Sequence, residues 1–432
     1  MGGLTALAAL VVAYTMIASK LDRWWITAPM VFVAAGAILG PGGLAVLPFA
    51  LGDETVLTIT ELTLALLLFA DASTVRLDDV EGDSGLPRRL LFAGLPMTIA
   101  IGALLAYLVF PGAGWAAAAL IATILAPTDA ALGLAVVTNK AVPVRIRRAL
   151  NVESGLNDGI ATPFVTLFVA AVAAEEALGG TAWGWEAVKQ IGLAIVAAIV
   201  VGHLGGRLLS AAAARGWTAQ VSEQIAILAL ALLAYEGSVA IGGNGFIAAF
   251  LGGLLFGAAT RGRLRAPVQF TETLGLATSF LVWALFGALF VGTLAFSVRP
   301  ILYAILSLTV IRLVPVAIAL LGTRLRPATV AFMGWFGPRG LASVVFLLIA
   351  LEEIEHAENG GLLVAAVTWT ILLSVVAHGV SASGLAAAYG KSIARAGDVA
   401  EKLPAGEPPI RVRDLAGRLH HSSSSHSSAS KP

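Results

Sequence analysis

The sequence has 432 residues, of which 58% are hydrophobic and only 12% are charged. This composition excludes a water-soluble domain, whose surface must be largely polar, and indicates a protein with many membrane-spanning helices. The chain has no cysteine, which excludes disulfides, a thiolate nucleophile and cysteine-ligated zinc or iron–sulfur centres. The net charge of +1 favours no particular partner. We expect the lipid bilayer, and no nucleic acid, around this protein.

Apolar runs long enough to cross a bilayer recur along the chain. The hydrocarbon core is about 30 Å thick, so a helix needs about 20 apolar residues to cross it. We read the first run as a membrane helix rather than a cleaved signal, because it lacks a basic leader and further runs follow. Thirteen such runs are predicted, near residues 3–19, 26–49, 55–75, 90–110, 114–138, 148–174, 187–212, 220–241, 245–260, 269–297, 299–322, 329–351 and 361–388.

The connections between these runs alternate in charge. Most basic residues follow odd-numbered spans, among them Arg88, Arg145 and Arg263, whereas connections after even-numbered spans are acidic or neutral. Basic loops stay in the cytoplasm, so the N-terminus should lie outside and the C-terminus inside, in a multi-pass protein of the cell membrane. The polar residues 396–432 are expected to form a short, disordered cytoplasmic tail.

Two of the thirteen spans are interrupted in the middle. Pro127, Thr128 and Asp129 break the fifth span, and the sequence GPRG at 337–340 breaks the twelfth. Spans seven apart have opposite orientations if two inverted six-helix units, about 1–178 and 218–390, flank a linking helix at 187–212. This is a transporter pattern, with binding where the half-helices meet, within a transmembrane domain of residues 1–395. Proline kinks also occur in receptors and channels.

Five ionisable residues lie at bilayer depth, namely Asp71, Asp129, Glu153, Asp158 and Arg339. Charges at this depth are costly, so they usually face a cavity, pair with one another and mark an ion path. Four carboxylates against one arginine leave an excess of negative charge, which suits a cation. Carboxylate and hydroxyl oxygens are ligands for a small hard ion such as Na+.

Helical spacing divides the segment NVESGLNDG at 151–159 into two faces. Ser154 and Asp158 lie about 40° apart on one face, as Glu153 and Asn157 do on another. We expect Ser154 and Asp158 to face the cation, and Glu153, braced by Asn157, to pair with Arg339. Since Asp158 has no counter-ion of its own, it could hold either a proton or a cation. Such competition suffices for exchange when the site opens alternately to each side.

Three motifs, PTDA at 127–130, NVESGLNDG at 151–159 and GPRGLAS at 337–343, resemble those of the cation/proton antiporter superfamily, and most closely its NhaP and NHE-like sodium/proton exchanger branch. The resemblance covers about residues 5–390. It implies an all-α fold of inverted repeats with crossed broken helices, a homodimer, elevator-like motion and no cofactor.

The resemblance also assigns roles to residues. It implies that Asp158 is the obligate cation and proton carboxylate, with Ser154, Thr128 and Asp129 completing the sodium shell. Glu153 and Arg339 match the structural ion pair of the family. Asn157, in place of a second aspartate, matches the electroneutral branch, which exchanges one proton for one cation. Asp71 departs from relatives, which often carry glutamate there, so its contribution to the site is the least defined.

Several alternatives stay open. A K+/H+ antiporter of the same fold would carry the same motifs, and a channel would need its site open to both sides at once. An intramembrane aspartyl protease would use Asp129 and Asp158 as a dyad, but their context lacks Gly-x-Gly-Asp. We therefore expect a transporter rather than an enzyme. Thr128 and Asp129 could instead cap a half-helix, Asp71 could be an interfacial charge, and Arg312 a locally paired one.

Overall fold

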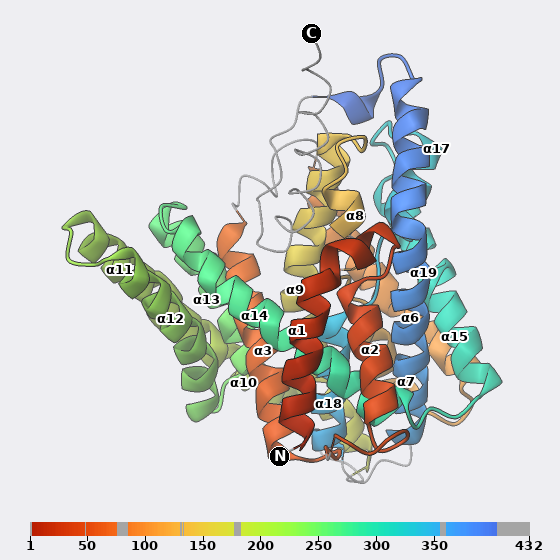
Figure 1. Cartoon of the computed structure of the whole chain (residues 1–432), viewed down its shortest axis with the longest axis horizontal. Helices are drawn as coiled ribbons and strands as arrows, with labels where there is room; N and C mark the ends of the chain where they lie inside the picture. Colours follow the sequence, from red (N-terminus) through yellow and green to blue (C-terminus); the bar gives the residue numbers. More distant parts are fainter. Residues whose placement is uncertain are drawn as a thin grey trace.

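The part of the chain that the structure describes is built from helices and turns, without strands (Figure 1). The structure is a computed structural model, and it describes residues 2–47, 49–75, 85–129, 132, 134–176, 183–354 and 360–403. The all-α class predicted from the composition is therefore confirmed.

One group of helices, here called bundle A, comes from two separate parts of the chain. Its central helix is α3 (Glu54–Thr74), which packs against α13 (Gly245–Thr260) and α14 (Arg265–Phe286). The remaining members surround these three helices: α1 (Gly2–Arg23), α2 (Ala28–Leu39), α10 (Trp183–Ala198), α11 (Gly205–Ala214), α12 (Gln220–Ala240) and the π-helical turns η3 (Ile199–Leu204) and η4 (Gly287–Val291).

The second group, bundle B, is made of the segments that lie between and after those of bundle A. Its longest helices are α9 (Val144–Glu176) and α19 (Gly360–Ala394). The other members are α5 (Leu86–Arg89), η2 (Leu90–Gly94), α6 (Leu95–Val109), α7 (Trp115–Ile124), α8 (Leu134–Val137), α15 (Val298–Leu308), α16 (Val310–Ala319), α17 (Pro327–Trp335) and α18 (Leu341–Glu353). The two bundles meet mainly where α9 and α18 contact α3, α10, α13 and α14.

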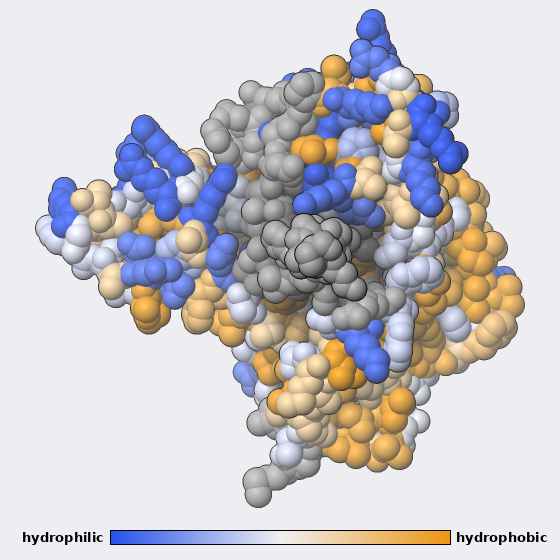
Figure 2. Space-filling model, turned by 45° about the horizontal axis from the view of Figure 1, so that its top comes forward, coloured by the Kyte–Doolittle hydropathy of each residue, from blue (hydrophilic) through white to orange (hydrophobic). Residues whose placement is uncertain are grey.

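Every predicted span overlaps one helix or a run of successive helices in the described residues. Eight helices are long and apolar enough to cross a membrane, and four shorter apolar ones accompany them, in the described ranges. The count of thirteen crossings stays a prediction. Hydrophilic residues gather at the end of the molecule that carries the turn after α11 and the end of α19, whereas apolar residues cover its flank (Figure 2). This distribution suits a protein set in a bilayer.

Glycines hold α13 against α3 at van der Waals distance. A Cβ atom on Gly253 would lie 2.3 Å from the carbonyl oxygen of Phe69, and one on Gly257 would lie 2.4 Å from that of Ser73. No side chain fits at either place, so the two backbones touch. Small residues allow this close approach between membrane helices, where the apolar lipid gives little hydrophobic drive for association. Asp71 of α3 lies between these two contacts and is fixed by them.

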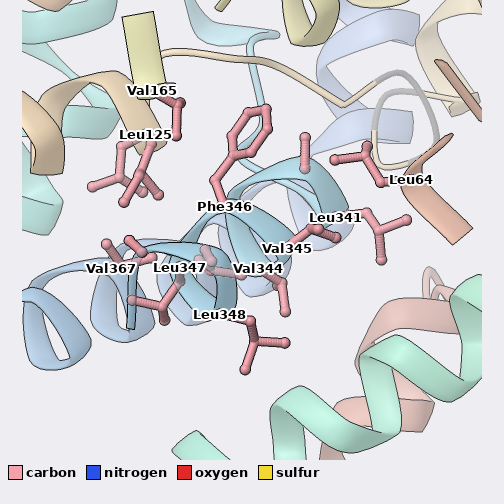
Figure 3. Close-up of a cluster of buried hydrophobic side chains, with 14 of the residues drawn as sticks. Leu64, Leu125, Val165, Leu341, Val344, Val345, Phe346, Leu347, Leu348 and Val367 are labelled. Atoms are coloured by element: carbon pink, nitrogen blue, oxygen red, sulfur yellow. The ribbon is translucent and has the colours of Figure 1, made fainter. Parts of the chain in front are cut away.

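Helix α18 is enclosed along most of its length, and its apolar residues from Leu341 to Leu348 are all buried. Figure 3 shows these side chains reaching Leu64 of α3, Val165 of α9 and Val367 of α19. Burial on every side explains why this segment is apolar all round instead of amphipathic. The helix therefore links both bundles at the level of the chain breaks.

A short segment after α19 returns to bundle B. Glu401, in the turn Ala400–Lys402, is 1% exposed and accepts hydrogen bonds from Arg326 N (2.8 Å) and Thr329 Oγ1 (2.6 Å) at the start of α17. Arg145, at the start of α9, donates to the carbonyl of Ala400. Residues 396–403 were expected in the disordered tail and are ordered here. Residues 404–432, the rest of that tail, lie outside the described residues.

Burial opposes the charge of Glu401, but hydrogen bonds from Thr329 and the Arg326 backbone outweigh it and hold the pKa of this carboxyl below its usual value. We therefore expect Glu401→Gln to destabilise the purified protein by about 1–2 kcal/mol at pH 7. The stability that this lowered pKa contributes is fully present above the ordinary pKa of a glutamate, near 4.3. It is lost as the pH falls from there through the pKa of Glu401 in the folded protein.

Thermal unfolding in detergent at pH 7 and pH 4 measures this difference. The matched control is Glu186→Gln, which removes a half-exposed carboxylate that pairs with Lys189. A Glu401→Gln protein as stable as the parent at pH 7 would show that the segment does not cap α17.

Candidate functional site

Two chain breaks, between α7 and α8 and between α17 and α18, cross each other inside bundle B. Asp129 N donates to the carbonyl oxygen of Pro338 at 2.8 Å, and Leu341 N donates to Asp129 Oδ2 at 3.1 Å. Ser343 Oγ donates to the carbonyl oxygen of Ile124 at 2.7 Å, next to the end of α7. Each break thus supplies partners for backbone groups that the other leaves open, as a low-dielectric interior requires.

Arg339 holds the crossing together from within. Its side chain is fully buried, and Nη1 donates to the carbonyl of Ala126 at 2.7 Å and to that of Pro127 at 3.4 Å. Nη2 donates to the carbonyl of Ser307 on α15 at 3.2 Å. A guanidinium fits this position because it can serve several carbonyls at once. The arginine is therefore occupied by backbone oxygens.

The crossing leaves no room for a side chain at Gly340. A Cβ atom there would lie 2.1 Å from both Cβ and Oδ2 of Asp129. Glycine thus lets the backbone come close enough for Asp129 to accept from Leu341 N. Asp129 therefore caps the start of α18, a helix of the other break. The alternative left open above was a cap on a half-helix of its own span.

Helix α19 braces the second break through polar residues that the sequence analysis missed. Ser374 Oγ accepts from Arg339 N at 2.7 Å, and His378 Nε2 lies 2.9 Å from the carbonyl oxygen of Trp335, where α17 ends. His378 is 1% exposed. The sequence signal that could have found them is a serine and a histidine one helical turn apart within the apolar span 361–388.

The expected pairing of Glu153 with Arg339 is wrong. Glu153 Oε1 lies 2.7 Å from Nη1 of Arg312 on α16, and both side chains are 3% exposed. The physical reason is that Arg339 already serves the carbonyls of the crossing, which leaves Arg312 as the counter-ion. The pair uses one carboxylate oxygen, because Glu153 Oε2 has no hydrogen-bond partner.

Asn157 also has a different partner from the one expected. Its Nδ2 donates to Thr128 Oγ1 at 2.6 Å, and it does not brace Glu153. Thr128 Oγ1 lies 3.3 Å from Ser154 Oγ. This chain of three polar side chains joins α9 to the first break, and all three are buried. Helical spacing places Asn157 on the same face as Glu153. The non-helical segment after α7, however, brings Thr128 within hydrogen-bond distance of Asn157.

A cavity between the bundles, here called cavity 1, brings together four of the predicted site residues. Asp129, Ser154 and Asp158 line it from bundle B, and Asp71 lines it from bundle A. Thr128 lies behind Ser154 and does not line this cavity. The other lining residues are Leu64, Leu67, Glu272, Leu276, Ser279, Trp283, Leu341 and Ala342.

Glu272 of α14 is a lining residue that the sequence analysis did not single out. It is 3% exposed, which is unusual for a carboxylate. Its place inside the predicted span 269–297 was the signal that could have found it. With Glu272, the cavity has four carboxylates and two serine hydroxyls, whereas its described lining includes no lysine or arginine. The oxygen-rich, negative surface can attract and coordinate a small cation.

A second cavity, cavity 2, follows cavity 1 along the same helix. Thr162, Thr166 and Val169 of α9 line it, together with Asn244 before α13 and Phe346 of α18. Asn244 Nδ2 donates to Thr166 Oγ1 at 2.8 Å across the bundle boundary. Cavity 1 lies toward the start of α9 and cavity 2 toward its end. Asp158 lines cavity 1, and Thr162, one turn further along α9, lines cavity 2 and donates to the carbonyl oxygen of Asp158 at 3.0 Å.

Comparison with known proteins identifies the chain at the level of the family. A family model described as "sodium/hydrogen exchanger, transmembrane" matches residues 6–388. A K+/H+ antiporter NhaP2 of Shewanella sp. strain ANA-3 is 28% identical over 262 residues, which cover 60% of this chain and 44% of that protein. The NhaP2 of Shewanella oneidensis is 26% identical over the same length. The chain thus aligns with less than half of these relatives.

Solved structures share the fold. The sodium proton antiporter MjNhaP1 from Methanocaldococcus jannaschii at pH 8 is 19% identical, with a TM-score of 0.71 over 90% of this chain and 99% of that one. An electron microscopy structure of the same antiporter gives a TM-score of 0.68 over 91% and 98%. The overall all-α fold is therefore shared with these antiporters. By its family match over residues 6–388, this chain belongs to the transmembrane sodium/hydrogen exchanger family.

Proposed function

We propose that the protein is a secondary transporter that exchanges a monovalent cation for protons at Asp158. The observation that carries this proposal is the position of Asp158, which lines cavity 1 with Ser154 and Asp129 and lies one helical turn before Thr162, a lining residue of cavity 2. Membership of the exchanger family supports the same conclusion. Such exchange needs no cofactor, because the cation and the proton are the transported substrates.

Alternating access requires a barrier on one side of the site at a time. Phe250 of α13 supplies one here, since a Cβ atom on Gly159 would lie 2.1 Å from its ring. The ring of bundle A therefore lies flat against the backbone of α9, one residue beyond Asp158. A displacement of bundle B along this contact would move Asp158 away from the bundle A wall of cavity 1, at Asp71 and Trp283, toward the bundle A wall of cavity 2, at Asn244 and Phe246. This geometry supports elevator-like motion of bundle B against bundle A.

Competition between a proton and a cation for one carboxylate couples the two fluxes. Asp158 is partly buried, and Ser154 and Asp129 line the same cavity, so an incoming cation can find several oxygens. Thr128, held by Asn157, orients Ser154 from behind. We assign these residues to the cation site. Because residue 157 is an asparagine rather than a second aspartate, we infer an electroneutral exchange of one proton for one cation.

Sodium is the cation that we propose, with Li+ as a related substrate. Potassium is the second candidate, because the two relatives named above are K+/H+ antiporters by name. An aspartyl protease, in which Asp129 and Asp158 share a proton, finds less support, since Asp129 Oδ2 already accepts from Leu341 N.

We further propose a homodimer in the cell membrane. Its N-terminus would be outside, and cavity 1 would open toward the basic, cytoplasmic end.

Asp158→Asn tests the proposed site. The amide cannot exchange a proton for a cation near neutral pH, so exchange in proteoliposomes should fall by at least about 100-fold, to the background of empty vesicles. Dequenching of a pH-sensitive dye after addition of Na+, Li+ or K+ measures the rate and identifies the cation. The variant should elute and unfold like the parent in detergent. Exchange that survives this substitution would overturn the mechanism.

The Glu153–Arg312 pair should contribute to stability rather than to ion binding. Removing one partner leaves a buried charge uncompensated, so Arg312→Ala should cost about 3–5 kcal/mol. The double variant E153L/R312M restores an apolar pair and should recover most of that loss. Arg299→Met, which changes an exposed arginine on α15, is the matched control.

Thermal unfolding and the KM for Na+ are measured together for these variants. The KM should stay within about twofold in the double variant, because neither residue lines cavity 1. A double variant as stable as the parent but with a lost cation affinity would mean that the pair belongs to the ion site.

A further inference from the structure

Helices α9 and α13 touch at two places across the boundary between the bundles. Asn244 Nδ2, just before α13, donates to Thr166 Oγ1 at 2.8 Å. Closer to Asp158, a Cβ atom on Gly159 would lie 2.1 Å from the ring of Phe250, so this ring lies against the α9 backbone. Going from the second contact to the first, α9 is followed forward and α13 backward. The helices are therefore antiparallel here, and the two contacts lie about 10 Å apart along them.

Asn244 is fixed on bundle A by its own hydrogen bonds. Its Oδ1 accepts from Ile247 N at 3.0 Å and so caps the start of α13. Its backbone N–H donates to the carbonyl oxygen of Gln190 at 3.1 Å, and Ser238 Oγ donates to its carbonyl oxygen at 3.1 Å. Because the cap uses the amide oxygen, Nδ2 is left to point across the boundary. Asn244 is thus a stationary donor on bundle A.

The partner of each contact recurs one helical turn earlier on α9. Thr162 lies four residues before Thr166, and Gly155 lies four residues before Gly159. Residues four apart share one face of a helix. Both threonines line cavity 2, and each hydroxyl donates to the carbonyl oxygen four residues before it, so its oxygen can accept. Helix α9 therefore offers a hydroxyl to the amide and a glycine to the ring in two registers, one turn apart.

The second register lies in the direction that exchange requires. Thr162 is located between Asp158 and Thr166 on α9. Moving bundle B until Thr162 reaches Asn244 would carry Asp158 about 6 Å, the rise of four helical residues. This displacement takes Asp158 away from the bundle A wall of cavity 1 and toward that of cavity 2. Displacements by one helical turn occur in two-state switches, because packed interfaces are bistable rather than continuously deformable.

We propose that Asn244 is a positioning residue that defines both end states of exchange. It donates to Thr166 when Asp158 faces cavity 1 and to Thr162 when Asp158 faces cavity 2. This inference rests on the proposed exchange function and adds to it the register of each state. Since one amide stabilises both states, losing either hydroxyl shifts the balance between them, and the direction depends on which hydroxyl is lost.

Bridging of paired cysteines tests the two registers. The chain has no cysteine of its own, so every thiol in these variants is an introduced one. Mercuric ion, which binds two thiolates, should bridge Asn244→Cys to Thr166→Cys in one variant and to Thr162→Cys in another. Loss of labelling by a maleimide dye detects the bridge. Either bridge should stop exchange in proteoliposomes until excess thiol removes the metal.

The matched control pairs Asn244→Cys with Ala170→Cys. Ala170 also lines cavity 2, but it lies one turn beyond Thr166, in the direction opposite to the proposed displacement. This pair should stay unbridged and keep its exchange activity in mercuric ion.

The cation KM, measured from each side of vesicles with one verified orientation, tests the hydrogen bonds themselves. Thr166→Val should disfavour the cavity 1 state about fivefold, as expected for one lost hydrogen bond, and raise the KM from that side relative to the other. Thr162→Val should change the ratio of the two KM values about fivefold in the opposite direction. Thr166→Ser and Thr162→Ser keep the hydroxyl and should retain the parent ratio.

The outcomes separate this inference from the exchange function. An unbridged Thr162 pair, a bridged Ala170 pair, or a KM ratio that changes in the same direction in both valine variants overturns the two registers. Exchange by Asp158→Asn, measured in parallel, overturns the proposed function instead. Bridges at Thr166 and Thr162 alone, with opposite changes of the KM ratio, support the proposal.

Discussion

The structure depends on how the backbone is satisfied where two helices break inside an apolar bundle. Each break frees carbonyl and N–H groups that hydrocarbon cannot accommodate. Arg339 serves the carbonyls of the first break, while Asp129 and Ser343 connect each break to the other. These contacts fix the crossing, and the crossing in turn sets the positions of Ser154 and Asp158 through Thr128. The proposed ion site thus depends on the contacts that satisfy the backbone groups of the two broken helices.

The buried charges are divided between two tasks. Glu153 pairs with Arg312, and Arg339 donates to backbone carbonyl oxygens of the crossing. Cavity 1 is lined by four carboxylates, Asp71, Asp129, Asp158 and Glu272. A protein that only needed stability would gain little from such a group of like charges, because their desolvation is costly. The excess of negative charge is what suits the site to a cation or a proton.

Apolar length and intramembrane charge predicted the all-α class, the two breaks and three of the four carboxylates that line cavity 1. The sequence did not predict which buried polar side chains form ion pairs or hydrogen bonds with one another. Glu153 and Arg312 lie on helices whose relative rotation is set by tertiary packing, so the choice between Arg312 and Arg339 required coordinates. Asn157 was misjudged for the same reason, since a non-helical segment carries Thr128 to it. Glu272 and His378 were missed because each is a single polar residue without a motif.

The claim that a cation and a proton compete for Asp158 is tested most directly by counting protons released on cation binding. Titration calorimetry of the purified protein with Na+ and with K+, in buffers of different ionisation enthalpy, gives this number without transport. We expect the number of protons released per cation bound to approach one at low pH, where the cation-free site is protonated, and to fall toward zero at high pH, with neither binding heat nor proton release in Asp158→Asn. Saturable cation binding with no proton released at any pH would contradict competition at this carboxylate.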